Sequence, residues 1–369
     1  MLVHLRARNF RNLAPLAWEP GAGTHLLLGG NGAGKTSLLE AVYAVATTKS
    51  FRAAQVADCR RHGSDGFHLA AEVEGDVRAK LELGWHLGPS GEGERLRAVN
   101  GSEVPLAEHL GVLPVVAWTA ADAEVVTGTP ALRRKLLDRG VVGLRPAALS
   151  ALSRYRRAMR QKRELLSAPG RIDSTELASW NAVAAAAAAE VIALRNAYAG
   201  KLSEGFAAVL AESGLAFPEI ALRYRPSPAV DPGQEGEALT TAVLGRFERA
   251  ADGERRRGVP LVGPHRDDLE ISWDGHAVRA TISAGERKSL SLLLSAAHGR
   301  LLTAAGSEPT YLLDDLDAEL AEATLARLWA VFSGARQLLA ASNRPTVWEG
   351  LEATRRTAVE EGRLTELTV

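Results

Sequence analysis

The stretch Gly29–Thr36, with the sequence Gly-Gly-Asn-Gly-Ala-Gly-Lys-Thr, constrains the fold of this chain more than any other feature. It follows an apolar run that ends at Leu28 and precedes Ser37–Tyr43, which has the pattern of a helix. Glycines let the backbone curl around an anion, and the next helix presents the positive end of its dipole. The order strand, loop, helix with complete G-x-x-x-x-G-K-T spacing predicts a P-loop that binds nucleotide phosphates.

The residue types in this loop indicate ATP and Mg²⁺ as the cofactors. Lys35 is expected to contact the β and γ phosphates and to contribute to catalysis, and Thr36 to give its hydroxyl to Mg²⁺. The loop positions predicted to contact the nucleotide are Gly29, Gly30, Asn31, Gly32, Ala33, Gly34, Lys35, Thr36 and Ser37.

Composition limits the class of protein but does not identify a partner. Apolar residues make up 46% of the 369 residues and charged residues 24%, as in soluble globular proteins. The formal net charge is zero, so a nucleic-acid site would have to be a local patch. Cys59 is the only cysteine, which excludes an internal disulfide. No signal peptide or membrane segment is visible, and a reducing cytosol is the expected location.

Apolar periodicity divides the chain into three segments. Residues 1–129 contain short alternating runs, which predict the P-loop with an antiparallel sheet beside it. Residues 130–250 have helical spacing and are expected to form an inserted helical lobe. Residues 251–369 return to strand patterns and are expected to complete the first lobe. The expected fold class is α/β, a P-loop ATPase head with an inserted helical lobe.

Glycines mark most of the helix and strand boundaries expected in the second half of the chain. An alanine-rich helix over residues 176–200 is expected to end at Gly200, with another helix as far as Ser213. The stretch Gly253–Gly258 is expected to separate a helix from a strand at Val259–Val262. The later strand Leu269–Trp273 is followed by Asp274-Gly275, a hairpin-turn signal.

Basic residues concentrate at the start of the helical segment. Residues 130–171 contain twelve lysines and arginines against two acids, Asp138 and Glu164. A helical surface of this charge is expected to bind the phosphate backbone of DNA. The alternative is an ordinary solvated helix face. The proposed DNA contacts are Arg133, Arg134, Arg156 and Arg157.

Two further motifs follow near the C-terminal end. The run Ser283–Glu286, Ser-Ala-Gly-Glu, precedes a long apolar helix, and the apolar Thr310–Leu313 is followed by Asp314 and Asp315. Asp314 is expected to bind Mg²⁺. Asp315 is expected to orient or deprotonate the attacking water, unless it is only a surface residue at a strand end. Ser283 and the N–H groups of its helix form a second anion-binding end.

The order of P-loop, Ser-x-Gly-Glu and paired aspartates resembles the ABC-type ATPase heads of the SMC and Rad50 superfamily. There, a serine-glycine signature from one subunit completes the nucleotide site of another. The resemblance implies an ATP-dependent homodimer in which Ser283, Gly285 and Glu286 contact the partner's nucleotide. By the same resemblance Arg11 and Asn12 contact nucleotide, or they are only a residue pair at a strand end.

One family within this superfamily matches nearly the whole chain. The stretches that carry the match are Asn9–Asn12, Leu39–Ala41, Lys49–Arg52, Val99–Gly101, Asp122, Gly128–Asp138 and Val262–Leu269. On these residues the chain resembles the RecF family of bacterial recombination mediators. The resemblance implies binding to junctions of single- and double-stranded DNA, with weak DNA-stimulated ATP hydrolysis that times release. It also implies work with RecO and RecR in loading RecA on gapped DNA.

Four residues depart from the family pattern. Glu286 replaces the usual Gln, Lys288 the usual Arg, Ala321 an Asp and Ser37 a common Asn. These changes leave nucleotide binding intact in our interpretation, but they leave the rate of hydrolysis and the affinity of the dimer open.

Other classes of protein carry the same motifs. The energy subunit of a transporter has them in this order, but it gives the basic helical segment no role. An ATP-switched scaffold that neither hydrolyses ATP nor binds DNA is a second alternative. An SMC-like or Rad50-like head with long arms would need heptads, which are absent. His265 and Asp267 lack a third metal ligand nearby and are expected to form a hydrogen-bonded loop.

Overall fold

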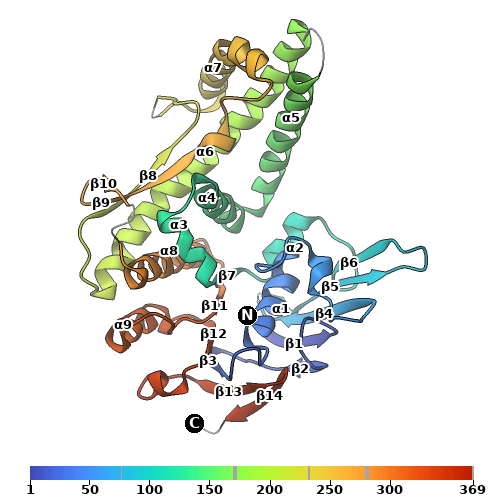
Figure 1. The fold of residues 1–369 in the computed structure, drawn as a ribbon, viewed down its shortest axis with the longest axis vertical. Coiled ribbons are helices and arrows are strands. Elements are labelled where there is room, and N and C mark those ends of the chain that lie inside the picture. Colours follow the sequence, from blue (N-terminus) through green and yellow to red (C-terminus); the bar gives the residue numbers. More distant parts are fainter. Residues whose placement is uncertain (76, 169–172, 232, 279–281, 368–369) are drawn as a thin grey trace. The chain divides into compact units, whose positions relative to one another are not determined.

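The structure is a computed structural model that describes residues 1–75, 77–168, 173–231, 233–278 and 282–367. The chain divides into two compact units (Figure 1). Unit 1 consists of residues 1–124, 208–216 and 282–369, and unit 2 of residues 125–207 and 217–281.

Unit 1 contains a mostly parallel sheet that leads into the glycine loop. Its strand order is β14-β13-β3-β12-β11-β7, and only the edge strand β14 is antiparallel to its neighbour. The central strands β3 and β12 are buried along nearly their whole length, as expected for strands covered on both faces. The strands are β3 (Gly23–Leu28), β7 (Val115–Trp118), β11 (Thr310–Leu313), β12 (Gln337–Ser342), β13 (Arg355–Glu360) and β14 (Arg363–Leu367).

A second, antiparallel sheet in unit 1 has the order β2-β1-β4-β5-β6. Helix α1 (Lys35–Thr47) lies between the two sheets, with β4 and β5 on one side and β11 and β12 on the other (Figure 1). Apolar side chains all around α1 are therefore buried. The strands of this sheet are β1 (Leu2–Arg8), β2 (Leu16–Trp18), β4 (Gly66–Val73), β5 (Ala79–Leu87) and β6 (Gly93–Val99).

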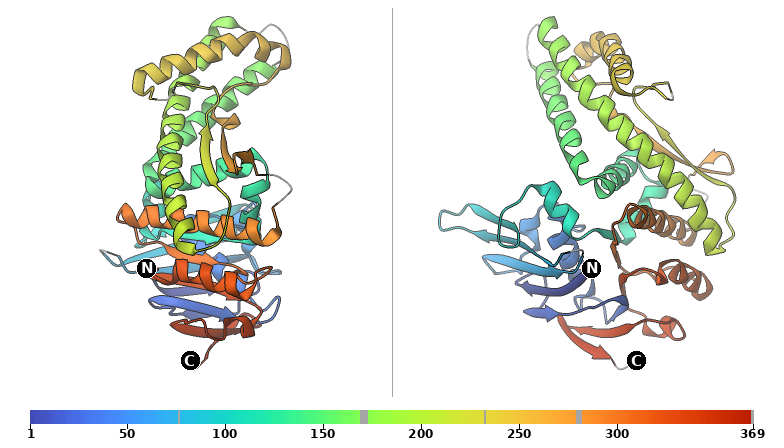
Figure 2. Two further views of the ribbon diagram at one scale, coloured as in Figure 1. Left: turned by 90° about the vertical axis from the view of Figure 1, so that its left-hand side faces the viewer. Right: turned by 180° about the vertical axis from the view of Figure 1, so that it is seen from behind.

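The remaining helices of unit 1 cover the parallel sheet or connect its strands. Helices α8 (Ala284–Ala304) and α9 (Glu322–Ser333) lie side by side, and α8 also contacts β7 (Figure 2). Helix α2 (Leu106–Val112) packs against α1. The short 3₁₀ turns are η1 (Val56–Cys59), η2 (Ala120–Ala123) and η5 (Pro345–Trp348).

Unit 2 is mostly helical and has a small antiparallel sheet of order β10-β9-β8. Its helices are α3 (Glu124–Thr127), α4 (Pro130–Leu144), α5 (Leu149–Ser167), α6 (Ser174–Ser213) and α7 (Gly236–Arg257), with the 3₁₀ turns η3 (Pro146–Ala148) and η4 (Pro264–Arg266). Its strands are β8 (Ile220–Arg225), β9 (Asp268–Trp273) and β10 (His276–Ala277). Alanines of α6 pack with aromatic residues of α5 and α7 in its core. Among the described helices only α6 is long and apolar enough to cross a membrane, and half of its most apolar window is buried inside the structure.

The predicted helix boundary at Gly200 is wrong. Helix α6 continues through Gly200 to Ser213. Tyr198, Ala199 and Leu202 around the glycine are buried. Their packing outweighs the cost of about 1 kcal/mol for a glycine inside a helix.

The predicted strand at Val259–Val262 is also wrong, because α7 extends to Arg257 through the expected loop. The helix ends at Gly258, whose φ of 66° is the left-handed cap conformation. The chain then folds back, and the backbone N–H of Leu261 donates to the buried carboxylate of Glu254 at 2.9 Å. Pro260 has no N–H to donate to a sheet.

The second boundary between the units lies at residue 282 rather than 251, and the first at 125 rather than 130. Residues 251–281 stay in unit 2 because β9 pairs with β8. Residues 208–216, at the end of α6 and just beyond it, belong to unit 1. The Asp274-Gly275 turn after β9 forms as expected, with φ values of 54° and 75°.

The run at residues 262–269, one of the stretches that carry the family resemblance, forms the buried polar centre of unit 2. Asp267 is fully buried and accepts hydrogen bonds from Arg195 at 2.8 Å, from the backbone N–H of Ser227 at 2.7 Å and from the Tyr224 hydroxyl. Arg195 also donates to Asp138 at 2.7 Å and 3.0 Å, which joins α6 to α4. The expectation of a hydrogen-bonded loop is confirmed.

Replacing Arg195 by Met is expected to destabilise unit 2 strongly, because it leaves Asp267 buried without its cation. The expected loss is about 3–5 kcal/mol. The matched control is Arg154→Met, which removes an exposed pair with Glu190 and should cost less than about 1 kcal/mol. Urea unfolding followed by tryptophan fluorescence measures both. Equal losses in the two variants would contradict the central role of Arg195.

Candidate nucleotide-binding site

The glycine loop joins the end of β3 to the start of α1, and neighbouring backbone leaves no room for side chains at two of its positions. A Cβ at Gly29 would lie 2.3 Å from the carbonyl oxygen of Val359. A Cβ at Gly34, where φ is 116°, would lie 3.1 Å from Cα of Gly362. Strand β13 and the turn after it therefore pack directly against the loop and restrict the path of its backbone. Gly30 and Gly32 face open space instead.

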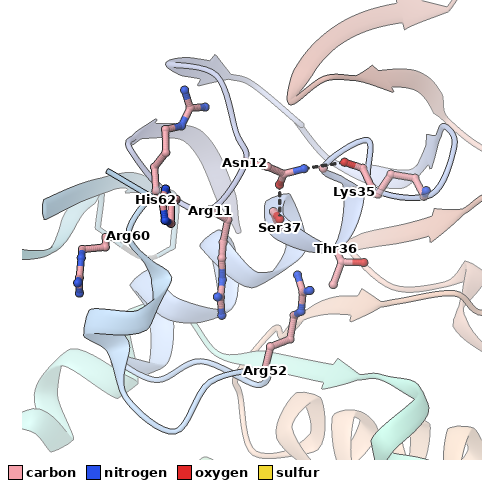
Figure 3. Close-up of a pocket in the computed structure, with 11 residues that line it drawn as sticks. Arg11, Asn12, Lys35, Thr36, Ser37, Arg52, Arg60 and His62 are labelled. Atoms are coloured by element: carbon pink, nitrogen blue, oxygen red, sulfur yellow. Dashed lines mark hydrogen bonds between the residues drawn. The ribbon is translucent and has the colours of Figure 1, made fainter. Parts of the chain in front are cut away.

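A pocket of about 600 Å³ opens on the glycine loop (Figure 3). It is lined by Arg11, Asn12, Gly32, Gly34, Lys35, Thr36, Ser37, Arg52, Arg60, Arg61 and His62. Seven of these eleven residues were predicted from the sequence to contact nucleotide. The lining includes several cationic side chains and no acidic one. Such a lining is complementary in charge to a triphosphate.

Lys35 lies against the loop that precedes it. Its ammonium group donates to the carbonyl oxygens of Gly29 at 2.8 Å and Gly30 at 2.9 Å. Burial lowers the pKa of Lys35, while the carboxylates of Asp315 and Asp314 act in the opposite direction. Lys35 is therefore held by the loop itself and interacts electrostatically with the two aspartates after β11.

Thr36 and Asp314 meet as the sequence predicts. The Thr36 hydroxyl donates to Oδ1 of Asp314 at 2.9 Å. Burial, and then the charge of Asp315, raise the pKa of Asp314 to about 6, while the hydrogen bond from Thr36 lowers it. A hydroxyl and a carboxylate oxygen side by side fit Mg²⁺, which binds few protein oxygens and takes its other ligands from phosphates and water. In the described residues no group of three His, Cys, Asp or Glu could hold a metal by itself.

Asn12 connects the end of β1 to the glycine loop. Its amide donates to the carbonyl oxygen of Gly32 at 2.7 Å, and its oxygen accepts from the Ser37 hydroxyl at 2.6 Å (Figure 3). On the other side, the amide of Asn343, just after β12, donates to Asn31 at 2.8 Å. These amides hold the loop in place at three points.

Arg11 lines the pocket, but its guanidinium is bound to protein. It donates to both carboxylate oxygens of Glu40, at 3.0 Å and 2.7 Å, and to the carbonyl oxygen of Asp58 at 2.9 Å. Glu40 is fully buried and also accepts from the Ser50 hydroxyl at 2.5 Å. Three of the family stretches thus meet at one carboxylate. In this arrangement Arg11 mainly orders the pocket wall.

Four pocket residues were missed by the sequence reasoning: Arg52, Arg60, Arg61 and His62. Arg52 lies beside Thr36 in Figure 3, and its guanidinium is 3.8 Å from Glu40. Arg60 lies over the ring of Trp85, 5.0 Å from its centre, and Arg61 donates to the carbonyl oxygen of Leu13. The Arg60-Arg61-His62 run was a possible signal, but a short basic run is most often a solvated surface.

The signature residues lie outside the pocket lining. Ser283 is the N-cap of α8, and its hydroxyl accepts from the N–H of Glu286 at 3.2 Å. The Glu286 carboxylate accepts from the Ser283 N–H at 2.8 Å and the Ser283 hydroxyl at 2.6 Å, and these hydrogen bonds lower its pKa. Ser283, Gly285 and Glu286 therefore do not complete the P-loop pocket of their own chain.

The predicted DNA contacts all lie in unit 2, but two of them are bound internally. Arg133 forms a two-pronged pair with Asp268 at 2.7 Å and 2.9 Å, and Arg134 donates to the carbonyl oxygen of Asp267 at 2.8 Å. Arg156 is exposed and lies 3.1 Å from Asp138, and Arg157 is exposed. Lys162, counted in the basic patch, is fully buried against Glu254 at 2.7 Å. Part of the basic patch is thus internal structure.

Comparison with known proteins identifies the family and the fold of this chain. The family model described as the RecF/RecN/SMC N terminal domain matches residues 1–365. The chain is 35% identical to the DNA replication and repair protein RecF of Acidothermus cellulolyticus, over 92% of this chain and 93% of that protein. It is 36% identical to the protein of the same name from Frankia alni, over 92% of each.

Solved structures agree on the fold. The structure titled recombination mediator protein RecF-ATP in the RecFOR pathway matches with a TM-score of 0.88 at 24% identity, over 100% of this chain and 97% of that one. An SMC head bound to part of ScpA matches with a TM-score of 0.56 at 15% identity, over 100% and 98%. The ABC-type head with an inserted helical unit is thereby confirmed, and the chain belongs to the RecF family.

Proposed function

We propose that this chain is an ATP-dependent DNA-binding protein of recombinational repair and replication restart. The observation that carries the proposal is the cationic pocket on the P-loop, with Thr36 and Asp314 at 2.9 Å beside Lys35. Curated relatives named for DNA replication and repair, at 35% and 36% identity, support the pathway. The chain would act in the cytosol on gapped DNA or junctions of single- and double-stranded DNA, and would help RecO and RecR to load RecA.

The glycine loop and the two aspartates after β11 would divide the chemistry between them. Gly29–Gly34 and Lys35 would bind the phosphates of ATP, and Thr36 and Asp314 would hold Mg²⁺, which neutralises phosphate charge when bound. Asp315 would orient or deprotonate the attacking water in slow hydrolysis that controls release from DNA.

A homodimer formed with ATP is the assembly that this arrangement supports. The N–H groups at the start of α8 are suited to an anion, yet Ser283, Gly285 and Glu286 do not line the pocket of their own chain. In a dimer they would contact the nucleotide of the partner.

The exposed face of α5 is the best-supported DNA surface. Arg156, Arg157, Arg160 and Arg163 all lie on this face with a single acid, Glu164. Arg157, Arg160 and Arg163 have no ion-pair partner in the part of the chain that the structure describes. Their charge is free for phosphates, so we move the proposed contact away from Arg133 and Arg134.

Lys35→Ala is expected to weaken ATP binding about tenfold to a hundredfold, because charge-assisted hydrogen bonds are worth about 1.5–3 kcal/mol each. ATP-dependent dimerisation should disappear with it. A fluorescent ATP analogue measures binding, and light scattering after gel filtration measures dimerisation. The control is Lys80→Ala, an exposed lysine on β5. A Lys35→Ala dimer in ATP would contradict the shared-nucleotide dimer.

Magnesium-dependent ATP binding is expected to weaken as pH falls through about 6, the pKa of Asp314. Above this pH the carboxylate is charged and can bind the ion, and below it a proton competes. Titration of Mg²⁺ with the fluorescent analogue from pH 5 to 8 checks this. Asp314→Asn should lose the dependence on Mg²⁺ at every pH. A midpoint near 4 would mean that Asp314 is not the group involved.

Reversing Arg157, Arg160 and Arg163 to Glu is expected to abolish DNA binding and leave ATP affinity unchanged. Fluorescence anisotropy of gapped DNA at several salt concentrations, with and without Mg-ATP, is the measurement.

A single substitution that removes one bound phosphate should lower the slope of log K against log salt concentration by about 0.9. Arg223→Glu, an exposed arginine on β8, is the control for Arg160→Glu alone. No DNA binding by the wild type at low salt would favour the ATP-switched scaffold or the transporter subunit.

A further inference from the structure

Lys288 is buried at a point where α8 meets the loop after β11. The residue is 4% exposed, and its ammonium group donates to the carbonyl oxygens of Asp315 at 2.7 Å and Ala318 at 2.6 Å. The ammonium also lies 5.1 Å from the centre of the Trp118 ring, a cation–π distance. Trp118 in turn donates to Ser291, one turn further along α8, at 2.9 Å. Lys288 is thus clamped between its own helix, an aromatic ring and the loop.

The loop that Lys288 binds has an unusual backbone. Asp315 has a φ of 50° and Glu319 a φ of 62°, and residues other than glycine rarely occupy this left-handed region. Such a conformation persists only when surrounding contacts impose it. The carbonyl oxygens of Asp315 and Ala318 point toward Lys288 as a result. A Cβ at Gly285 would lie 3.3 Å from the carbonyl oxygen of Glu319, so the first turn of α8 packs closely on the loop.

The charges around Lys288 explain why a cation is buried here. Burial lowers the pKa of Lys288 to about 8, while Asp317, Glu319, Asp315 and Asp314 act in the opposite direction. Asp317 is 1% exposed, and its Oδ2 has no hydrogen-bond partner in the described structure. The lysine supplies positive charge to a loop that would otherwise bury carboxylates without compensation.

We propose that Lys288 is a positioning residue for Asp315, and that it ties the carboxylate that acts on water to the N-terminal part of the signature helix α8. The inference rests on the proposed function and deepens it. Ser283, which would contact the partner's nucleotide, is the N-cap that opens the first turn of the same helix, five residues before Lys288. A displacement of that turn by the partner's nucleotide would move two carbonyl oxygens of the loop and, with them, Asp315. Hydrolysis in one chain would thereby depend on the nucleotide held by the other.

The test compares Lys288→Met with Lys288→Arg. Lys288→Met has nearly the volume of lysine and removes the charge and the donors. It is expected to reduce kcat for ATP at least tenfold and to change KM and the affinity for the fluorescent analogue less than twofold. Lys288→Arg keeps a cationic donor and should recover most of kcat. A merely structural role would not separate kcat from KM in this way. The control is Lys80→Met on the surface of β5, which should leave all values unchanged.

Hydrogen exchange gives a readout that does not depend on hydrolysis. The N–H groups of Ala318 and Leu320 donate within the loop to Asp315 and Asp317 at 3.3 Å. In Lys288→Met their exchange is expected to accelerate at least tenfold, and in Lys288→Arg to return toward the wild-type rate. If Lys288→Met exchanges these N–H groups at the wild-type rate, or keeps the wild-type kcat in an assay in which the wild type hydrolyses ATP, the inference about Lys288 is overturned and the proposed function stands. A wild type that binds ATP and never hydrolyses it would overturn the proposed hydrolysis, and the role of Lys288 with it.

Discussion

The burial of α1 between two sheets is the constraint on which unit 1 depends. A helix covered on both sides has no freedom to tilt or slide, since its side chains interdigitate with β4 and β5 and with β11 and β12. Its first residues, Lys35 and Thr36, are therefore held at one place relative to β11. That placement brings the Thr36 hydroxyl to Asp314, 278 residues further along the chain. The hydrophobic core thus assembles the chemical site.

Buried carboxylates organise the polar parts of both units. Glu40 gathers Arg11 and Ser50 behind the pocket, and Asp267 gathers Arg195 and Tyr224 in unit 2. A buried charge is costly unless every oxygen finds a donor, so such a site specifies its surroundings closely. This explains why a stretch that carries the family resemblance but does not line the nucleotide pocket, residues 262–269, is rich in internal hydrogen bonds. These hydrogen bonds fix the packing of α4, α6 and β8 in unit 2.

Local patterns predicted the elements well where local and tertiary preferences agree. The glycine loop, the paired aspartates, the strand after Asp267 and the Asp274-Gly275 turn all lie where periodicity and turn chemistry placed them. The errors arose where packing overrode a local signal. Gly200 did not end α6, because its neighbours are buried on the helix, and Val259–Val262 did not extend, because Glu254 binds the backbone of Leu261. Hydrophobic periodicity and glycine positions alone did not reveal either contact.

The sequence by itself determined the class of fold and the chemistry of the phosphate site, because a P-loop is a local arrangement of glycines, a strand and a helix. It also supplied the paired carboxylates and the basic residues, as residue types. Only the tertiary structure decided which of these residues are free. Arg133 and Lys162 are neutralised by acids more than 90 residues away, whereas Arg157, Arg160 and Arg163 remain exposed. The physical reason is that the energy of a charge depends on its burial and its partners, and both are set by segments distant in sequence.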